Sequence, residues 1–178
     1  MQNLGLVGVK SVHGKYLQAH KDNGEMHASN SNRNEEETWF LIEVDKANHI
    51  YALQNWDNHN YLSKKPPHCQ RADVADIGAT EQWILVSGQH YGVGAKVGIR
   101  CLADKTFMGA NDEGDDTECG GEVMTKDAFE PPQGDGGWPG WWTFEAASTP
   151  EPGRDFWNAA GGVLVGVAID ALSAALLS

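Results

Sequence analysis

The sequence predicts an all-β fold, and three observations support this expectation. Glycine is abundant, with 21 residues among 178, while stretches of helical periodicity are scarce. The motif GKYLQA at residues 14–19 returns as HNYLSK at 59–64 and as KTFMGA at 105–110. A tryptophan-containing segment follows each copy. Short apolar runs that alternate with polar turns are typical of all-β domains.

The three copies share a longer pattern than one motif. Each copy has an alternating strand, a polar turn and then an aromatic residue followed by an apolar one. The aromatic residues are Tyr16, Tyr61 and Phe107. The repeat interval is about 45 residues, which is the length of one structural repeat of several short strands.

A second strand closes each copy, with the segments TWFLIEV, QWILVSG and WWTFEAA. Side chains alternate between the two faces of a strand. One face is apolar in every copy, and its residues are Trp39 and Leu41, Trp83 and Leu85, and Trp142 and Phe144. The opposite face changes from apolar to polar between copies. We therefore expect the three tryptophans in the core.

Three copies that close around one axis make a β-trefoil, and closure removes the exposed edge strands that a single copy would leave. The sequence predicts a trefoil over residues 1–147, with lobes at about 5–49, 50–92 and 93–147. Residues 148–155 have the composition of a linker. Residues 156–178 are apolar and are expected to form a C-terminal helix.

The first lobe carries a family resemblance. GKYLQA, then EMHAS and ETWFLIEV, resembles the fascin and hisactophilin branch of β-trefoils, which repeats G-x-[YF]-[LI]-x-[AS]. The resemblance covers about residues 5–147, and it implies a β-trefoil. Fascin uses four trefoils to bundle actin, and a single trefoil could cross-link filaments only if its C-terminal segment oligomerised it, so actin bundling is not carried over directly. Ricin-type lectins have Q-x-W in each lobe, whereas this chain has E-T-W, E-Q-W and G-W-W. The dense histidine loops of hisactophilin-like proteins are missing, so their pH switch is not carried over.

Composition limits the partners and the compartment. The formal net charge of −12 repels phosphate backbones and disfavours nucleic-acid binding. Cys69, Cys101 and Cys119 lack C-x-x-C spacing, which favours free thiols over one disulfide and a single thiol. The segment MQNLGLVGVK does not resemble a signal peptide. We expect a cytoplasmic protein, or one released without a signal peptide.

Two aromatic loops are candidates for ligand binding. In the turn NWDNHN, Trp56 lies beside Asp57, Asn58 and His59, which together offer a stacking ring and hydrogen-bonding groups for a monosaccharide. Turn chemistry alone explains the Asn and Asp residues. In the loop GDGGWPG, Trp138 is expected either to stack on a sugar or a partner, or to fold back over the barrel mouth or the C-terminal segment.

The third lobe is longer than the other two. Two insertions of about six residues fall within 111–121 and 131–140. The acidic run NDEGDD lies in the first insertion and lacks the full pattern of a calcium loop, so we expect a solvated turn. Surface insertions on a closed barrel often carry function.

Catalytic chemistry has no sequence signature in this chain. No nucleophile motif, phosphate-binding loop, distinctive acid–base pair or zinc-type histidine spacing is found. We expect no enzymatic activity, no catalytic residues, no cofactor and no metal site.

The C-terminal segment has the pattern of an apolar helix. Val165, Ile169, Leu172 and Leu176 fall on one seam, and Gly162 and Gly166 lie beside it at the spacing that allows two helices to approach closely. Such a helix can dock on its own domain, assemble subunits, or insert into a membrane with Trp157 at the interface.

These features predict a non-enzymatic recognition module that binds a glycan or a cell-surface protein, with a C-terminal helix for oligomerisation. An alternative is a membrane-active, pore-forming or cytolytic toxin, in which the trefoil targets and residues 156–178 insert. A further alternative is an actin-binding or cross-linking protein.

Overall fold

The structure is a computed structural model, and it describes residues 1–65, 70–91, 93–110, 123–126, 133–134 and 136–147. The expected C-terminal helix, the linker and the acidic insertion at 111–121 lie outside these ranges. Cys69 and Cys119 lie outside them too. Cys101 is a buried free thiol, and burial raises its pKa.

The described chain is all-β, as the sequence predicts, and contains two short 3-10 turns. Four strands form the first lobe: β1 (Gln2–Ser11), β2 (Tyr16–Ala19), β3 (Met26–Asn30) and β4 (Thr38–Asp45). The second lobe contains β5 (Ile50–Asn55), β6 (Tyr61–Lys64), β7 (Gln70–Val74), η1 (Ala79–Glu81), β8 (Trp83–Ser87) and η2 (Gly88–Tyr91). The third contains β9 (Val97–Cys101), β10 (Phe107–Ala110), β11 (Val123–Lys126) and β12 (Trp141–Ala146).

Six strands close into a barrel, two from each lobe. β1 pairs with β4, β4 with β5, β5 with β8, β8 with β9, β9 with β12, and β12 returns to β1. All of these pairs are antiparallel. The closed ring leaves no barrel strand with an unpaired edge, which is the solution that the repeat predicts.

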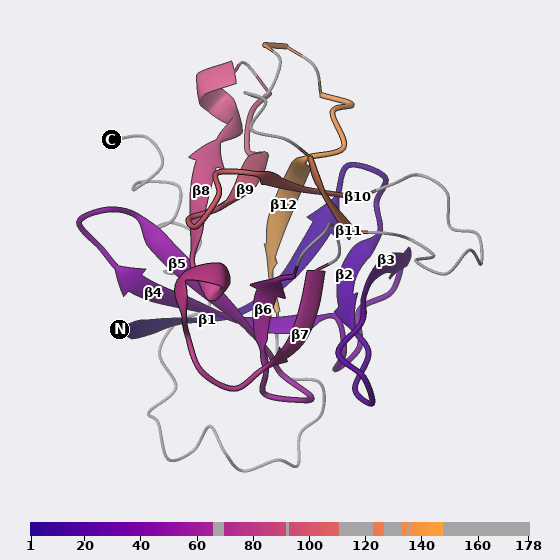
Figure 1. The fold of residues 1–178 in the computed structure, drawn as a ribbon. Helices are drawn as coiled ribbons and strands as arrows, with labels where there is room; N and C mark the ends of the chain where they lie inside the picture. Colours follow the sequence, from indigo (N-terminus) through magenta and orange to yellow (C-terminus); the bar gives the residue numbers. More distant parts are fainter. Residues whose placement is uncertain (66–69, 92, 111–122, 127–132, 135, 148–178) are drawn as a thin grey trace.

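The other six strands form three hairpins, β2–β3, β6–β7 and β10–β11. Each hairpin continues from a barrel strand through an equivalent pair, namely Lys10 with Tyr16, Gln54 with Tyr61, and Arg100 with Phe107. Strands β3, β7 and β11 contact one another, so the hairpins gather at one end of the barrel. Figure 1 shows them on one side of the molecule. This arrangement has the three-fold character of a β-trefoil.

The core confirms the apolar face that the sequence predicts. Trp39, Trp83 and Trp142 are at most 1% exposed. They pack with the inward residues of the other barrel strands in one cluster. The outer positions of the same strands differ between the lobes: Phe40 and Ile42 are buried in lobe 1, whereas Thr143 in lobe 3 is partly exposed.

The third lobe differs from the others two residues before its core tryptophan. Glu37 and Glu81 are buried there in lobes 1 and 2, and each carboxylate accepts hydrogen bonds that hold the preceding loop. Lobe 3 has Gly140 instead. A Cβ on Gly140 would lie 2.3 Å from Cη2 of Trp138, so the glycine leaves room for that indole.

Candidate functional site

The turn between β5 and β6 is built by its asparagine side chains. Asn55 Oδ1 accepts from the backbone N–H groups of Asp57 and Asn58 at 3.1 and 3.2 Å. Its amide nitrogen donates to the carbonyl of Glu36 at 2.8 Å. Asn55 is fully buried, so the turn is fixed to the end of the barrel rather than hanging free.

Asn58 is likewise occupied by structure. Its Oδ1 accepts from the N–H of Asn60 at 2.9 Å, and its Nδ2 donates to the carbonyl of Ala72 in β7 at 3.3 Å. Ligand hydrogen bonds from Asn58 would therefore compete with bonds that define the turn. Asn58 thus stabilises the turn, which is the role that turn chemistry predicts for it.

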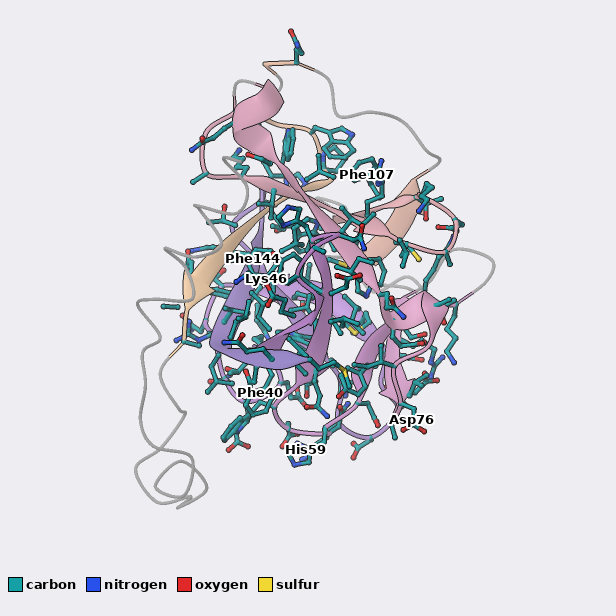
Figure 2. All side chains as sticks on the ribbon, turned by 90° about the vertical axis from the view of Figure 1, so that its left-hand side faces the viewer. Phe40, Lys46, His59, Asp76, Phe107 and Phe144 are labelled. Carbon is teal, nitrogen blue, oxygen red and sulfur yellow. The ribbon has the colours of Figure 1, made fainter. Side chains whose placement is uncertain are left out.

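Asp57 and His59 are the two side chains of this turn that remain available. Asp57 is half-buried and His59 is exposed. Across the described ranges, neither side chain has a hydrogen-bond or ion-pair partner. Figure 2 shows His59 at the lower end of the molecule, opposite Phe107.

His59 has a left-handed backbone, with φ of 60°. The equivalent positions in the other lobes are Gly14, with φ of 79°, and Lys105, with φ of 66°. In lobes 2 and 3 the backbone N–H of this residue donates to the carbonyl four residues earlier, from His59 to Asn55 at 3.1 Å and from Lys105 to Cys101 at 3.0 Å. The turn of lobe 1 is one residue shorter, and Gly14 N–H donates to the carbonyl of Ser11 at 3.0 Å. Glycine adopts this conformation without cost, whereas a histidine is strained in it.

Trp56 does not offer the stacking ring that the sequence predicts. Its side chain is only 6% exposed, and its ring centroid lies 5.2 Å from that of Phe40 on β4. The indole faces the outer apolar side of the first two lobes rather than solvent. Its Nε1–H is buried and has no acceptor among the described residues. The expectation for Trp56 is corrected by its packing on Phe40, which lies on the neighbouring strand β4.

Trp138 follows the second of the two expectations, because it folds back over the barrel. It is 8% exposed and packs edge-to-face on Phe107 and Trp141, with centroid distances of 5.3 and 5.1 Å. These three residues form a small cluster of their own. Trp138 and the turn at Asn55–Asn60 are not brought together into one site.

A polar group in lobe 1 was missed by sequence reasoning. Gln18 on β2 pairs in register with His27 on β3. Gln18 Nε2 donates to Glu36 at 2.5 Å, and the rings of His20 and His27 lie 5.9 Å apart, edge-to-face. The signal that could have found it is the alternation of the two hairpin strands, which places Gln18 and His27 on the same face.

A charged group links lobes 1 and 3. Tyr16 Oη donates to Glu145 Oε2 at 2.5 Å, and Lys10 lies 3.4 Å from the same carboxylate. The hydrogen bond from Tyr16 lowers the pKa of Glu145, and the same bond raises the pKa of Tyr16. Lys10 Nζ also lies 5.0 Å from the Tyr16 ring centroid, in a cation–π arrangement.

Two features, a metal site and a membrane-spanning helix, are absent from the described residues. No group of three or more His, Cys, Asp or Glu side chains is placed to hold a metal ion there. A helix with the length and hydropathy needed to cross a bilayer is not found in those residues either.

Comparisons with solved structures agree with the barrel and its three hairpins. A structure titled as a BEL β-trefoil matches with a TM-score of 0.61 and 12% identity, covering 82% of this chain and 94% of that one. The chain has a β-trefoil fold. No family model and no curated protein sequence matches it, so its resemblance to the fascin and hisactophilin branch stays a prediction.

Two further β-trefoil matches come from proteins with described activities. A Polyporus squamosus lectin, bound to the epitope Neu5Acα2-6Galβ1-4GlcNAc, matches with a TM-score of 0.61 and 15% identity, covering 81% of this chain and 49% of that one. A mosquitocidal holotoxin matches with a TM-score of 0.61 and 14% identity, covering 85% of this chain. The chain spans only 17% of the holotoxin's length. At these identities the matches show the fold.

Proposed function

We propose that this chain is a non-enzymatic recognition module that binds a glycan through the turn at Asn55–Asn60. The observation that carries the proposal is the pair Asp57 and His59. Both side chains are free of hydrogen bonds within the described structure, and they stand on a turn that Asn55 and Asn58 hold rigidly. A strained, non-glycine residue on a rigid turn is a common feature of binding sites.

The chemistry of the pair suits sugar hydroxyls. An ionised carboxylate accepts from two neighbouring hydroxyls, while an imidazole can donate or accept one further hydrogen bond. The exposed face of His59 also gives a small ring on which part of a sugar can rest. Because the chain has a net charge of −12, the proposal favours a neutral glycan over a sialylated one.

A glycan array probed with the full chain tests this proposal. The double variant D57N/H59A should lose at least about tenfold in apparent affinity, because it removes both free groups while leaving the turn bonds of Asn55 and Asn58 in place. Lys105→Ala changes the equivalent turn position of lobe 3 and should bind like the wild type. A blank array, or equal binding by D57N/H59A, would contradict the proposal.

The second candidate is a membrane-active toxin, with the trefoil as its targeting part. The observation that favours it is the apolar segment 156–178, which follows the last barrel strand and contains a single charge, Asp170, from residue 159 onward. Similarity to part of a holotoxin supports it as analogy. Dye release from liposomes by the full chain, abolished when residues 156–178 are deleted, is the expected result. Absence of dye release from the intact chain would contradict it.

Self-association through residues 156–178 belongs to the first proposal, since an oligomer would bind glycans multivalently. Light-scattering mass of the full chain over a range of concentrations tests it, and a monomer at every concentration would contradict it. For actin cross-linking, co-sedimentation with filaments is the test, and a protein that stays in the supernatant would contradict that alternative.

A further inference from the structure

The outer face of the barrel carries an apolar surface across β1, β4 and β5. We name this surface the outer apolar patch, and its members are Leu6, Phe40, Ile42, Ala52 and Trp56. They form a continuous surface because Leu6 pairs in register with Phe40, and Ile42 with Ala52. Figure 2 shows Phe40 at the lower end of the barrel, near the level of His59.

The same positions are polar in lobe 3. Phe40 and Ile42 follow the core tryptophan of β4 by one and three residues, and Thr143 and Glu145 do the same on β12. The barrel therefore does not require apolar side chains there. An apolar outer face on an antiparallel sheet indicates that something packs on it.

Burial supports that inference. The members of the outer apolar patch are at most 9% exposed although they lie outside the barrel. The described residues that border them, Val44, Tyr61 and Ile77, are themselves only partly buried. Phe40 and Trp56 cover each other in part, with ring centroids 5.2 Å apart. A segment packed on this outer face would complete the burial of both rings.

Trp56 adds a polar requirement. Its indole N–H is buried in the patch and donates to no acceptor within the part of the chain that the structure describes. An unmade hydrogen bond of a buried donor destabilises the fold. A covering segment with a backbone carbonyl or a hydroxyl above Trp56 would satisfy it, whereas the acyl chains of a lipid would not.

The end of β12 points to the occupant. Ala147, directly after β12, belongs to the same cluster, and its N–H donates to the carbonyl of Leu6 at 2.9 Å. The chain thus leaves the barrel at the outer apolar patch. The segment 156–178 follows after eight residues, which span at most about 29 Å when fully extended.

We propose that residues 156–178 of the same chain cover the outer apolar patch in the free protein. Their tether gives a local concentration in the millimolar range, so binding in cis should outcompete a second copy at micromolar protein. The apolar seam of Val165, Ile169, Leu172 and Leu176 supplies a matching surface. This inference goes beyond glycan recognition and does not depend on it. It implies that any assembly or membrane role of the segment requires its release from lobe 1.

Site-specific photocrosslinking in the full chain tests the proposal directly. A photoreactive phenylalanine analogue at position 40 should crosslink to peptides within 156–178, in a product with the mass of a monomer. A covalent dimer as the main product would assign the patch to a second copy and overturn the proposal. Crosslinks confined to residues before 148 would overturn it as well.

Hydrogen exchange provides a second, independent readout. The variant F40T/I42E gives lobe 1 the outer residues that lobe 3 has, so the barrel should tolerate it. Exchange of the backbone amides in 156–178 should accelerate at least about tenfold in this variant. Ile84→Thr, at the equivalent outer position of β8, is the matched control and should leave that exchange unchanged. Equal exchange in F40T/I42E and the wild type, with a native near-UV spectrum, would overturn the proposal; should this variant not fold, the crosslinking result decides.

Discussion

The indole N–H of Trp39 donates to the backbone carbonyl of Leu17 at 2.9 Å, inside the core. The same bond joins Trp83 to Leu62 at 3.1 Å and Trp142 to Met108 at 2.9 Å. In each lobe it ties the last barrel strand to the first strand of the hairpin. The tryptophan thus fills the core and also satisfies a buried carbonyl, which explains its recurrence in every lobe.

Replacing Trp83 by phenylalanine should destabilise the fold. The carbonyl of Leu62 would lose its partner in the core, at a cost of about 1–3 kcal/mol. For a domain of this size the melting temperature should fall by about 3–10 °C. Trp39→Phe and Trp142→Phe should behave alike because the bond is equivalent. A Trp83→Phe chain that melts with the wild type would contradict this role.

Gly140 should be intolerant of a side chain because of Trp138. An alanine Cβ would lie 2.3–2.6 Å from three ring atoms of Trp138, and Gly140→Ala should cost about 1–3 kcal/mol. Chemical denaturation measures the effect, and Trp138→Ala in the same chain should remove most of it as a coupling between neighbours. Gly109→Ala is the matched control, because its closest new contact would be 3.4 Å. Additive effects of the two substitutions would contradict the predicted contact.

His59→Gly should raise stability while it removes a binding group. A left-handed backbone costs a non-glycine residue about 1–2 kcal/mol, and the added flexibility of the unfolded glycine offsets about half. Thermal unfolding should therefore shift upward by about 1–3 °C. Gly14→Ala, at the equivalent turn with φ of 79° and open space around the new Cβ, should shift it downward. Stabilisation by Gly14→Ala would show that backbone strain at this position is negligible.

Acid should weaken the fold through Glu145. The hydrogen bond from Tyr16 lowers the pKa of Glu145 from its usual value of 4.5. Its contribution to the free energy of unfolding is therefore present above about pH 4.5, and it is lost as the pH falls through the pKa of the folded state. Since the carboxylate is partly exposed, the contribution is about 1 kcal/mol. The stability difference between wild type and Glu145→Gln, measured by denaturation from pH 3 to 7, should shrink toward acid. A difference that is independent of pH would contradict it.

The repeat made the barrel predictable from sequence. The alternation around Trp39, Trp83 and Trp142 marks one face that is apolar in all three copies, and such a face must be internal whichever strand it belongs to. The interval between Tyr16, Tyr61 and Phe107 then fixes the number of lobes. Both inferences need only periodicity along the chain.

The environments of Trp56 and Trp138 could not be predicted in the same way. Trp56 is buried by Phe40, whose outer position depends on how β4 pairs with β5. The indole of Trp138 fits because Gly140 has no side chain at the point of contact. In the sequence, Gly140 looks like an ordinary loop glycine. A loop aromatic is exposed or buried according to the packing of the folded chain, so composition alone leaves both outcomes open.

The candidate site was only partly predictable for a related reason. Turn chemistry identified Asn55–Asn60 as a polar turn, but it does not say which of its side chains hold the turn and which are available to a ligand. Asn58 donates a hydrogen bond to the carbonyl of Ala72, whereas the side chains of Asp57 and His59 have no hydrogen-bond partner among the described residues. This difference depends on the approach of β7 to the turn, which the repeat does not encode.

Proton NMR of the histidine rings during a saccharide titration tests the central claim most directly. The seven histidines are built-in probes, and His59→Ala assigns the resonance of interest. The full chain is titrated with three neutral saccharides, galactose, N-acetylglucosamine and lactose, each to tens of millimolar. At least one of them should shift the His59 resonance saturably. The resonance of His49, which lies in another turn, should not shift. If no saccharide moves His59, or if only other histidines respond, the turn at Asn55–Asn60 is not a glycan site and the proposed function is wrong.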